Sequence, residues 1–147
     1  MTTDLATAGR LGAAEHWLAV VATTREDGSV HASLVNAGIL DHPVTGEPTI
    51  GVVARGDARK LVHLRRTGRA TVVFRSGWEW VAVEGPASIC GPDHEMDGIP
   101  AEEIPALLRD VFRAAGGTHD DWDEYDRVMA ADRRAVVFVT PARITGN

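Results

Sequence analysis

The feature that most constrains this chain is a series of short, β-branched runs separated by short, glycine-containing turns. Connections of this length join neighbouring antiparallel strands, because a parallel connection needs a dozen or more residues. Asp27-Gly28 and Ser76-Gly77 lie between such runs, and glycine supplies the positive φ that a tight hairpin turn requires. The pattern predicts six strands, at residues 17–24, 30–40, 49–54, 69–75, 78–90 and 134–140.

Six strands linked mainly by hairpins favour a mainly β (α+β) fold in which an antiparallel sheet closes into a small six-stranded barrel. Flanking helices are expected at residues 4–15, 58–67, 100–115 and 120–131. Without repeats or a linker, residues 1–147 are expected to form one domain. Closing the sheet and pairing it with a second copy would both hide its edges, so we expect an oligomer.

Charge and hydropathy narrow the possible partners. The formal net charge is -6, which argues against nucleic acid or anionic lipid as the main partner. No run approaches the roughly 20 apolar residues that cross a bilayer, and we expect neither a membrane span nor a secretory signal. Cys90 is the single cysteine, so an intrachain disulfide is excluded and the reducing cytoplasm is the expected location.

The common catalytic and metal-binding motifs are missing. The sequence has no Gly-x-Gly-x-x-Gly after a strand, no Walker loop, no zinc-ligand spacing and no nucleophile elbow. His94, Glu95 and Asp97 lack a second group of ligands to complete a metal shell. We therefore expect no metal site and no catalytic set of side chains.

Basic residues concentrate where a strand ends and a helix begins, in the segment ARGDARK. Lys60 is the only lysine among 15 basic residues, and Arg55 and Arg59 precede it, while Asp57 is expected to cap the helix. Helix N-termini expose N–H groups and a partial positive charge, so this junction could hold a phosphate. From the residues alone, solvated cations on a surface helix remain the alternative.

Helical periodicity predicts an amphipathic helix after this junction, with Gly68 as its C-terminal stop. One arc of the helix is apolar and the other is polar. The apolar arc holds Ala58, Leu61, Val62 and Leu64, and the polar arc holds Arg59, Lys60, His63 and Arg66.

Several short motifs follow one another in an order that matches a known family. They are Arg59-Lys60, Leu64-Arg65-Arg66, Arg69-Ala70 and Val83-Glu84-Gly85. With this order, residues 17–90 resemble the pyridoxamine 5'-phosphate oxidase-like, FMN-binding split-barrel superfamily. Residues 119–141 are similar to its coenzyme F420-dependent branch. The resemblance implies a split barrel and a homodimer with the cofactor at the subunit interface.

The resemblance also implies a cofactor site. Arg59 and Lys60 match the positions that hold the cofactor phosphate, with Arg55 as a third cation. The residues implied to lie along the ring are Ser33, Leu34, Val35 and Asn36, and Trp78 matches a position near the cofactor cleft that often faces the partner subunit. His63 and Gly68 stand where the family usually has asparagine and proline, which affects ring and tail contacts only.

An oxidoreductase is the function that the resemblance implies. The expected reaction is hydride transfer from reduced F420 to a small conjugated or electron-poor acceptor. FMN is the alternative cofactor, as in the oxidases and flavin reductases of this superfamily. A carrier that holds the cofactor without turnover is the remaining alternative.

Overall fold

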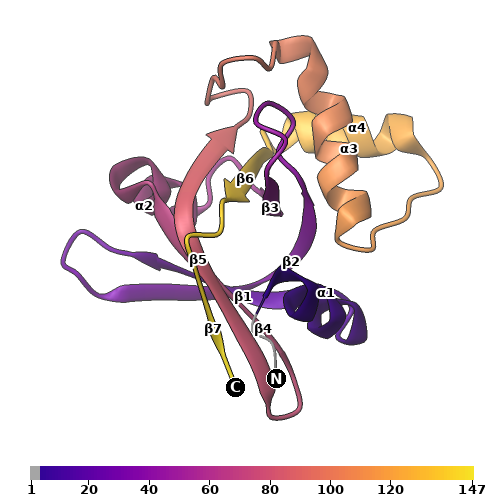
Figure 1. Ribbon diagram of the computed structural model, residues 1–147. Coiled ribbons are helices and arrows are strands. Elements are labelled where there is room, and N and C mark those ends of the chain that lie inside the picture. The colour runs from indigo at the N-terminus through magenta and orange to yellow at the C-terminus, as the bar shows by residue number, and fades with distance from the viewer. Residues whose placement is uncertain (1–3) are drawn as a thin grey trace.

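Six of the seven strands formed by residues 4–147, the part that the computed structural model describes, close into an antiparallel barrel (Figure 1). The strand order is β4-β1-β2-β3-β6-β5, and pairing of β5 with β4 closes the ring. This confirms the six-stranded antiparallel barrel expected from the hairpin pattern. The barrel strands are β1 Leu18–Thr24, β2 Val30–Asp41, β3 Pro48–Ala54, β4 Arg69–Ser76, β5 Glu79–Cys90 and β6 Ala135–Val139.

A seventh strand, β7 at Arg143–Gly146, lies beyond the last strand that the sequence predicts, at residues 134–140. It pairs with residues 81–84 of β5, on the edge that β6 occupies further along at residues 87–90. The long strand β5 therefore has β4 on one side, and β7 followed by β6 on the other.

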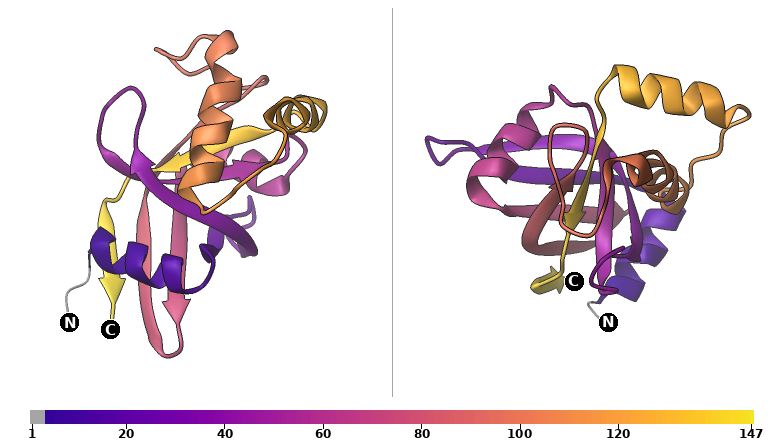
Figure 2. Two further views of the ribbon diagram at one scale, coloured as in Figure 1. Left: turned by 90° about the vertical axis from the view of Figure 1, so that its right-hand side faces the viewer. Right: turned by 90° about the horizontal axis from the view of Figure 1, so that it is seen from above.

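Four α-helices surround the barrel (Figure 2) within residues 4–147, and none of them has the length and apolarity needed to cross a bilayer. α3 packs on β2 and β3, with α4 beside it, whereas α2 contacts β1 and β5. The short 3-10 turn η1, Ala101–Glu103, precedes α3. The helices are α1 Leu5–Ala14, α2 Arg59–Thr67, α3 Ile104–Ala114 and α4 Trp122–Ala131.

The ends of α2 match the sequence expectation at one end only. Gly68 stops the helix in the left-handed conformation, with φ of 67°. The expected cap by Asp57 is wrong: Ala58 occupies the N-cap position, and no side chain caps the helix. The carboxylate of Asp57 instead faces Arg55, with 3.4 Å between Oδ1 and Nε.

Two hydrophobic clusters hold the fold together. The first fills the barrel and extends to α1 and α2, and the second lies between β6 and the helices α3 and α4. β6 separates the two clusters, with Val137 in the first and Val136 and Phe138 in the second. Because both faces of β6 are covered, all five of its residues are buried, which explains its continuous apolar sequence.

The barrel is split between β2 and β3. Their ladder runs from Asp41↔Pro48 to Ala37↔Val52 and stops there. Beyond that pair, residues 34–36 of β2 pair only with β1, and residues 53–54 of β3 pair only with β6. The two strands therefore diverge and leave an opening in the wall of the barrel.

Candidate functional site

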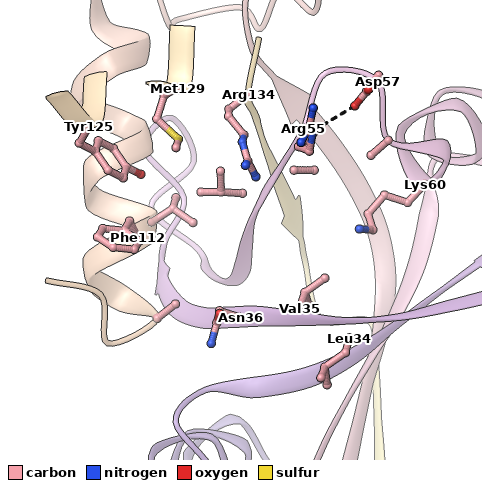
Figure 3. A pocket seen from close by; sticks show the side chains of 15 residues that line it. Leu34, Val35, Asn36, Arg55, Asp57, Lys60, Phe112, Tyr125, Met129 and Arg134 are labelled. Atoms are coloured by element: carbon pink, nitrogen blue, oxygen red, sulfur yellow. Dashed lines mark ion pairs between the residues drawn. The ribbon is translucent and has the colours of Figure 1, made fainter. Parts of the chain in front are cut away.

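A pocket of about 480 Å³ lies at this split (Figure 3). Residues 34–36 of β2 form one of its edges and residues 53–55, at the end of β3, form another. Main-chain groups alternate between the two edges of a strand, and the N–H of Ala37 donates to the carbonyl of Trp17 on the β1 side, 2.8 Å away. The main-chain groups of Leu34 and Asn36 therefore point toward the split.

Helix α3 approaches this opening closely at Gly38. A Cβ atom built on Gly38 would lie 2.5 Å from the carbonyl carbon of Ala114, at the C-terminal end of α3. A larger residue would push the helix away, so glycine allows α3 to press against β2. This contact brings Phe112 and Ala115 to the pocket wall.

Three cations line the pocket: Arg55, Lys60 and Arg134. A close contact between two backbone segments, at Gly56, brings Arg134 to the other two. The N–H of Gly56 donates to the carbonyl of Asp132 at 3.1 Å, and a Cβ on Gly56 would lie 2.6 Å from the carbonyl oxygen of Arg133. The loop after β3 thus rests directly on the loop before β6. As a result Arg134 lies near Arg55 in Figure 3, with the amine of Lys60 directed into the same pocket.

Lys60 is the cation with no partner. Within residues 4–147 its amine forms neither an ion pair nor a hydrogen bond, whereas Arg134 is held by Asp132 at 3.1 Å and Arg55 faces Asp57. Burial, with the nearby charge of Arg134 as a smaller cause, lowers the pKa of Lys60 below its ordinary value. A bound anion would relieve both the unmet hydrogen-bonding demand and the repulsion between the cations.

An apolar wall faces the cations across the pocket and comes from α3 and α4. The rings of Phe112 and Tyr125 lie 4.9 Å apart, with Met129 beside them (Figure 3). The hydroxyl of Tyr125 donates to the carbonyl of Leu108 at 3.1 Å, and burial raises the pKa of Tyr125 to about 12. Tyr125 is therefore a neutral wall residue whose proton is already engaged.

Five of the eight site residues expected from the sequence line this pocket. They are Leu34, Val35, Asn36, Arg55 and Lys60. The other three, Ser33, Arg59 and Trp78, do not.

Arg59 departs from the expectation that it acts together with Lys60. Successive helix residues point about 100° apart, and Arg59 lines a different cavity on another side of α2. Ser33 lies on the face of β2 that packs toward the barrel interior, and its Oγ is buried without a hydrogen-bond partner among the described residues. Trp78 belongs to the turn between β4 and β5, where it is 94% exposed.

The expected faces of α2 are also wrong at two positions. Val62 was placed inward and His63 outward, but Val62 is exposed and His63 is buried. The reason is a polar contact that periodicity cannot predict: Nδ1 of His63 lies 2.9 Å from Oγ1 of Thr23, a buried residue of β1.

The sequence analysis identified neither Arg134 nor the apolar wall as part of the site. Arg134 carried one usable signal, because it ends a basic pair directly before an apolar strand, as Arg55 directly follows one. Phe112, Tyr125 and Met129 carried no comparable signal, since their helical spacing is also that of ordinary core residues.

Comparison with known proteins supports the fold. No protein-family model matches this sequence. A conserved hypothetical protein from Mycobacterium tuberculosis is similar in structure, with 19% identity, a TM-score of 0.69, and 99% of this chain and 84% of that chain covered. A pyridoxamine 5'-phosphate oxidase-related, FMN binding protein from Nostoc punctiforme has 10% identity and a TM-score of 0.65, with 97% and 80% covered. An F420 reductase has 14% identity and a TM-score of 0.59, with 88% and 89% covered. The chain therefore has the split-barrel fold that these proteins share.

Proposed function

We propose that the pocket at the split binds a flavin-type cofactor. Arg55, Lys60 and Arg134 would hold the phosphate, and the ring would lie between residues 34–36 of β2 and the wall formed by α3 and α4. The observation that carries this proposal is the amine of Lys60. It has no partner within residues 4–147, and it faces Arg134 in a pocket whose opposite wall is aromatic and apolar.

The pocket fits such a group in size and in the chemistry of its lining. Its volume of about 480 Å³ lies within the range of roughly 300–1,000 Å³ that is usual for small-molecule sites. A ligand with an anionic end and a flat apolar end matches cations on one side and aromatic rings on the other. The main-chain groups of Leu34 and Asn36 would meet the polar edge of a ring.

Coenzyme F420 is the proposed cofactor, with FMN as the alternative. Residues 119–141, which resemble the F420-dependent branch, contribute Tyr125, Met129 and Arg134 to the pocket, so this similarity falls on residues that would contact the cofactor. When bound, a reduced deazaflavin supplies a hydride for transfer to a small electron-poor acceptor. The protein would anchor the phosphate, hold the ring against Phe112 and keep water from one ring face. Tyr125 and Lys60 would position the cofactor and move no proton.

A second copy of the chain is proposed to complete the site. Leu18, Val20, Leu34 and Trp80 are exposed on the outer face of the barrel, and Val20 and Leu34 are cross-strand partners. Leu34 is 66% exposed and also lines the pocket, so a subunit packed on this face would cover the pocket edge. The exposed Trp78 would then contact the partner subunit.

A Val20→Asp change tests the dimer, because it places a charge at the centre of this face. It should give a monomer in light scattering and weaken cofactor binding, while the matched change Val44→Asp, at an exposed position in the loop between β2 and β3, should do neither. A parent protein that is monomeric at all concentrations would contradict the proposed dimer.

Direct titration tests the cofactor. FMN and F420 are added separately to the purified protein, and binding is followed by fluorescence polarisation. F420 is expected to bind more tightly than FMN. Tight FMN binding without an F420 response would favour the alternative cofactor, and no binding of either would overturn the proposal.

Turnover separates an enzyme from a carrier. The protein is loaded with reduced F420 and offered quinones, nitroarenes and tetrapyrroles while reoxidation is followed by absorbance. Reoxidation faster than in the protein-free control supports an oxidoreductase. Equal rates for every acceptor would favour a carrier.

A further inference from the structure

A second cavity, of about 460 Å³, lies on another side of α2 from the pocket at the split. Figure 1 shows the β1–β2 hairpin projecting on the same side of the barrel as α2. We call this cavity the rear cavity, and its lining comes from the hairpin and the helix. The lining residues are Arg25, Glu26, Asp27, His31, Arg59, Val62, His63 and Arg66.

The three arginines of the rear cavity have no carboxylate partner. None of them forms an ion pair within residues 4–147. Arg25 donates to the carbonyl of Val30 at 2.7 Å and Arg66 to that of Thr24, while the side chain of Arg59 has no hydrogen bond to any residue that the structure describes. A guanidinium carries five N–H donors, so each arginine keeps donors for a ligand.

The two acidic residues of the lining form no ion pair with these arginines, although the charge of Arg25 acts on Asp27 from a distance. The carboxylate of Asp27 accepts hydrogen bonds from the main chain and the hydroxyl of Ser29, at 2.9 and 2.6 Å. Those bonds stabilise the hairpin turn and lower the pKa of Asp27. Glu26, at the exposed tip of the hairpin, makes no ion pair with any of the arginines.

Two histidines line the rear cavity. The rings of His31 and His63 meet edge to face with centroids 5.4 Å apart. Nδ1 of His31 is buried and has no partner among residues 4–147. Burial lowers the pKa of His63, and the charges of His31, Arg59, Arg25 and Arg66 lower it further. The three arginines are thus close enough to the His63 ring for their charges to add to the effect of burial.

We infer that the rear cavity is a second anion-binding site, for a phosphomonoester of a small polar molecule. A phosphate dianion presents acceptors on every side, which suits three guanidinium groups from two elements. The cavity is larger than a phosphate needs, which leaves room for the small molecule that carries the phosphate, and seven of its eight lining residues are polar or charged. This inference does not depend on a flavin binding at the split.

Histidine ring resonances in NMR give a readout specific to this site. The probe is sulfate, which has the shape of a phosphate dianion and keeps its charge between about pH 5 and 8, where histidine titrates. Ionic strength is held constant with sodium chloride. Sulfate should shift the resonances of His31 and His63 saturably and raise the pKa of His63, because the anion offsets the arginine charges. The exposed His16 should not respond.

Adjacent residues of α2 supply a matched pair of variants. Arg59→Gln should weaken the sulfate response of His63 roughly ten-fold or more, since it removes a charge-assisted contact. Lys60→Gln should leave that response intact, because Lys60 lines the pocket at the split. Glycerol 3-phosphate should displace sulfate more effectively than inorganic phosphate does.

Three outcomes would overturn the inference. They are no saturable response at His63, an equal response at His16, or loss of the response in Lys60→Gln with retention in Arg59→Gln. Equal displacement by inorganic phosphate and glycerol 3-phosphate would overturn the phosphomonoester assignment. Failure of FMN and F420 to bind would leave all these results unaffected.

Discussion

The pocket at the split and the rear cavity each gather three cations, yet their other walls differ. Around the first, Phe112 and Tyr125 supply rings and a buried apolar cluster. Around the second, Val62 is the only apolar residue, and two histidines take the place of the rings. In both proposals the basic residues would hold an anionic group, while the opposite wall would select what that anion is attached to. The first wall suits a ring and the second a more polar group.

Removing a cation from each site should test this division with the largest effect. Lys60→Ala removes a charge-assisted contact of about 1.5–3 kcal/mol, so F420 affinity should fall roughly 10- to 150-fold in polarisation titrations. Arg59→Ala, one residue away, should change that affinity less than about three-fold. Equal losses in the two variants would mean that both residues hold one phosphate, as the sequence suggested, and the division would fail.

Changing the wall should separate ring binding from phosphate binding. Phe112→Leu keeps an apolar side chain but loses the aromatic face, worth about 0.5–1.5 kcal/mol, so cofactor affinity should fall roughly 2- to 10-fold. The sulfate response of His63 should stay at its parent value, because Phe112 does not line the rear cavity. An unchanged cofactor affinity would place the ring away from this wall.

Ligand binding should depend on pH in both sites, but through different groups and in different pH ranges. In the pocket at the split the group is Lys60. Lys60 attracts a phosphate only while charged, and its pKa is lowered in the free protein, so affinity should fall as pH rises through that value. The loss should therefore begin at a lower pH than it would for an ordinary, solvent-exposed lysine. Lys60→Arg should flatten the profile, since guanidinium stays charged.

The rear cavity should respond at the acid end. The pKa of His63 is lowered, and the protonated ring attracts an anion, so sulfate affinity should rise as pH falls through that value. A sulfate affinity that stays constant in the range where His63 titrates would mean that the charge of His63 does not act on the bound anion.

Much of the barrel could be predicted from the sequence, because its strands are joined by local turns. Gly28 and Gly77 have positive φ, as the two expected hairpins require. Each turn fixes the pairing of the strands beside it, so neighbours in sequence become neighbours in space. The short strand β7 escaped prediction because its four residues gain their structure from pairing with β5.

The candidate site was only half predictable, since its residues come from distant parts of the chain. Lys60 was identifiable because it follows a strand end locally, whereas Arg134 reaches the same pocket only through the contact at Gly56. A helical wheel places Arg59 and Lys60 on one polar face. The structure separates them: Arg59 lies beside the β1–β2 hairpin and lines the rear cavity, whereas Lys60 lines the pocket at the split. The sequence does not show this separation, because both neighbouring elements are distant along the chain.

The early end of the β2–β3 ladder has a consequence for how this pocket can change. Its edges are stretches of peptide backbone that diverge because each is committed to a different neighbouring strand. Because the edges of the opening are main chain, replacing one surrounding side chain should leave the opening in place. Substitutions on the two covering helices would therefore change the lining of the pocket while the barrel itself need not be rebuilt.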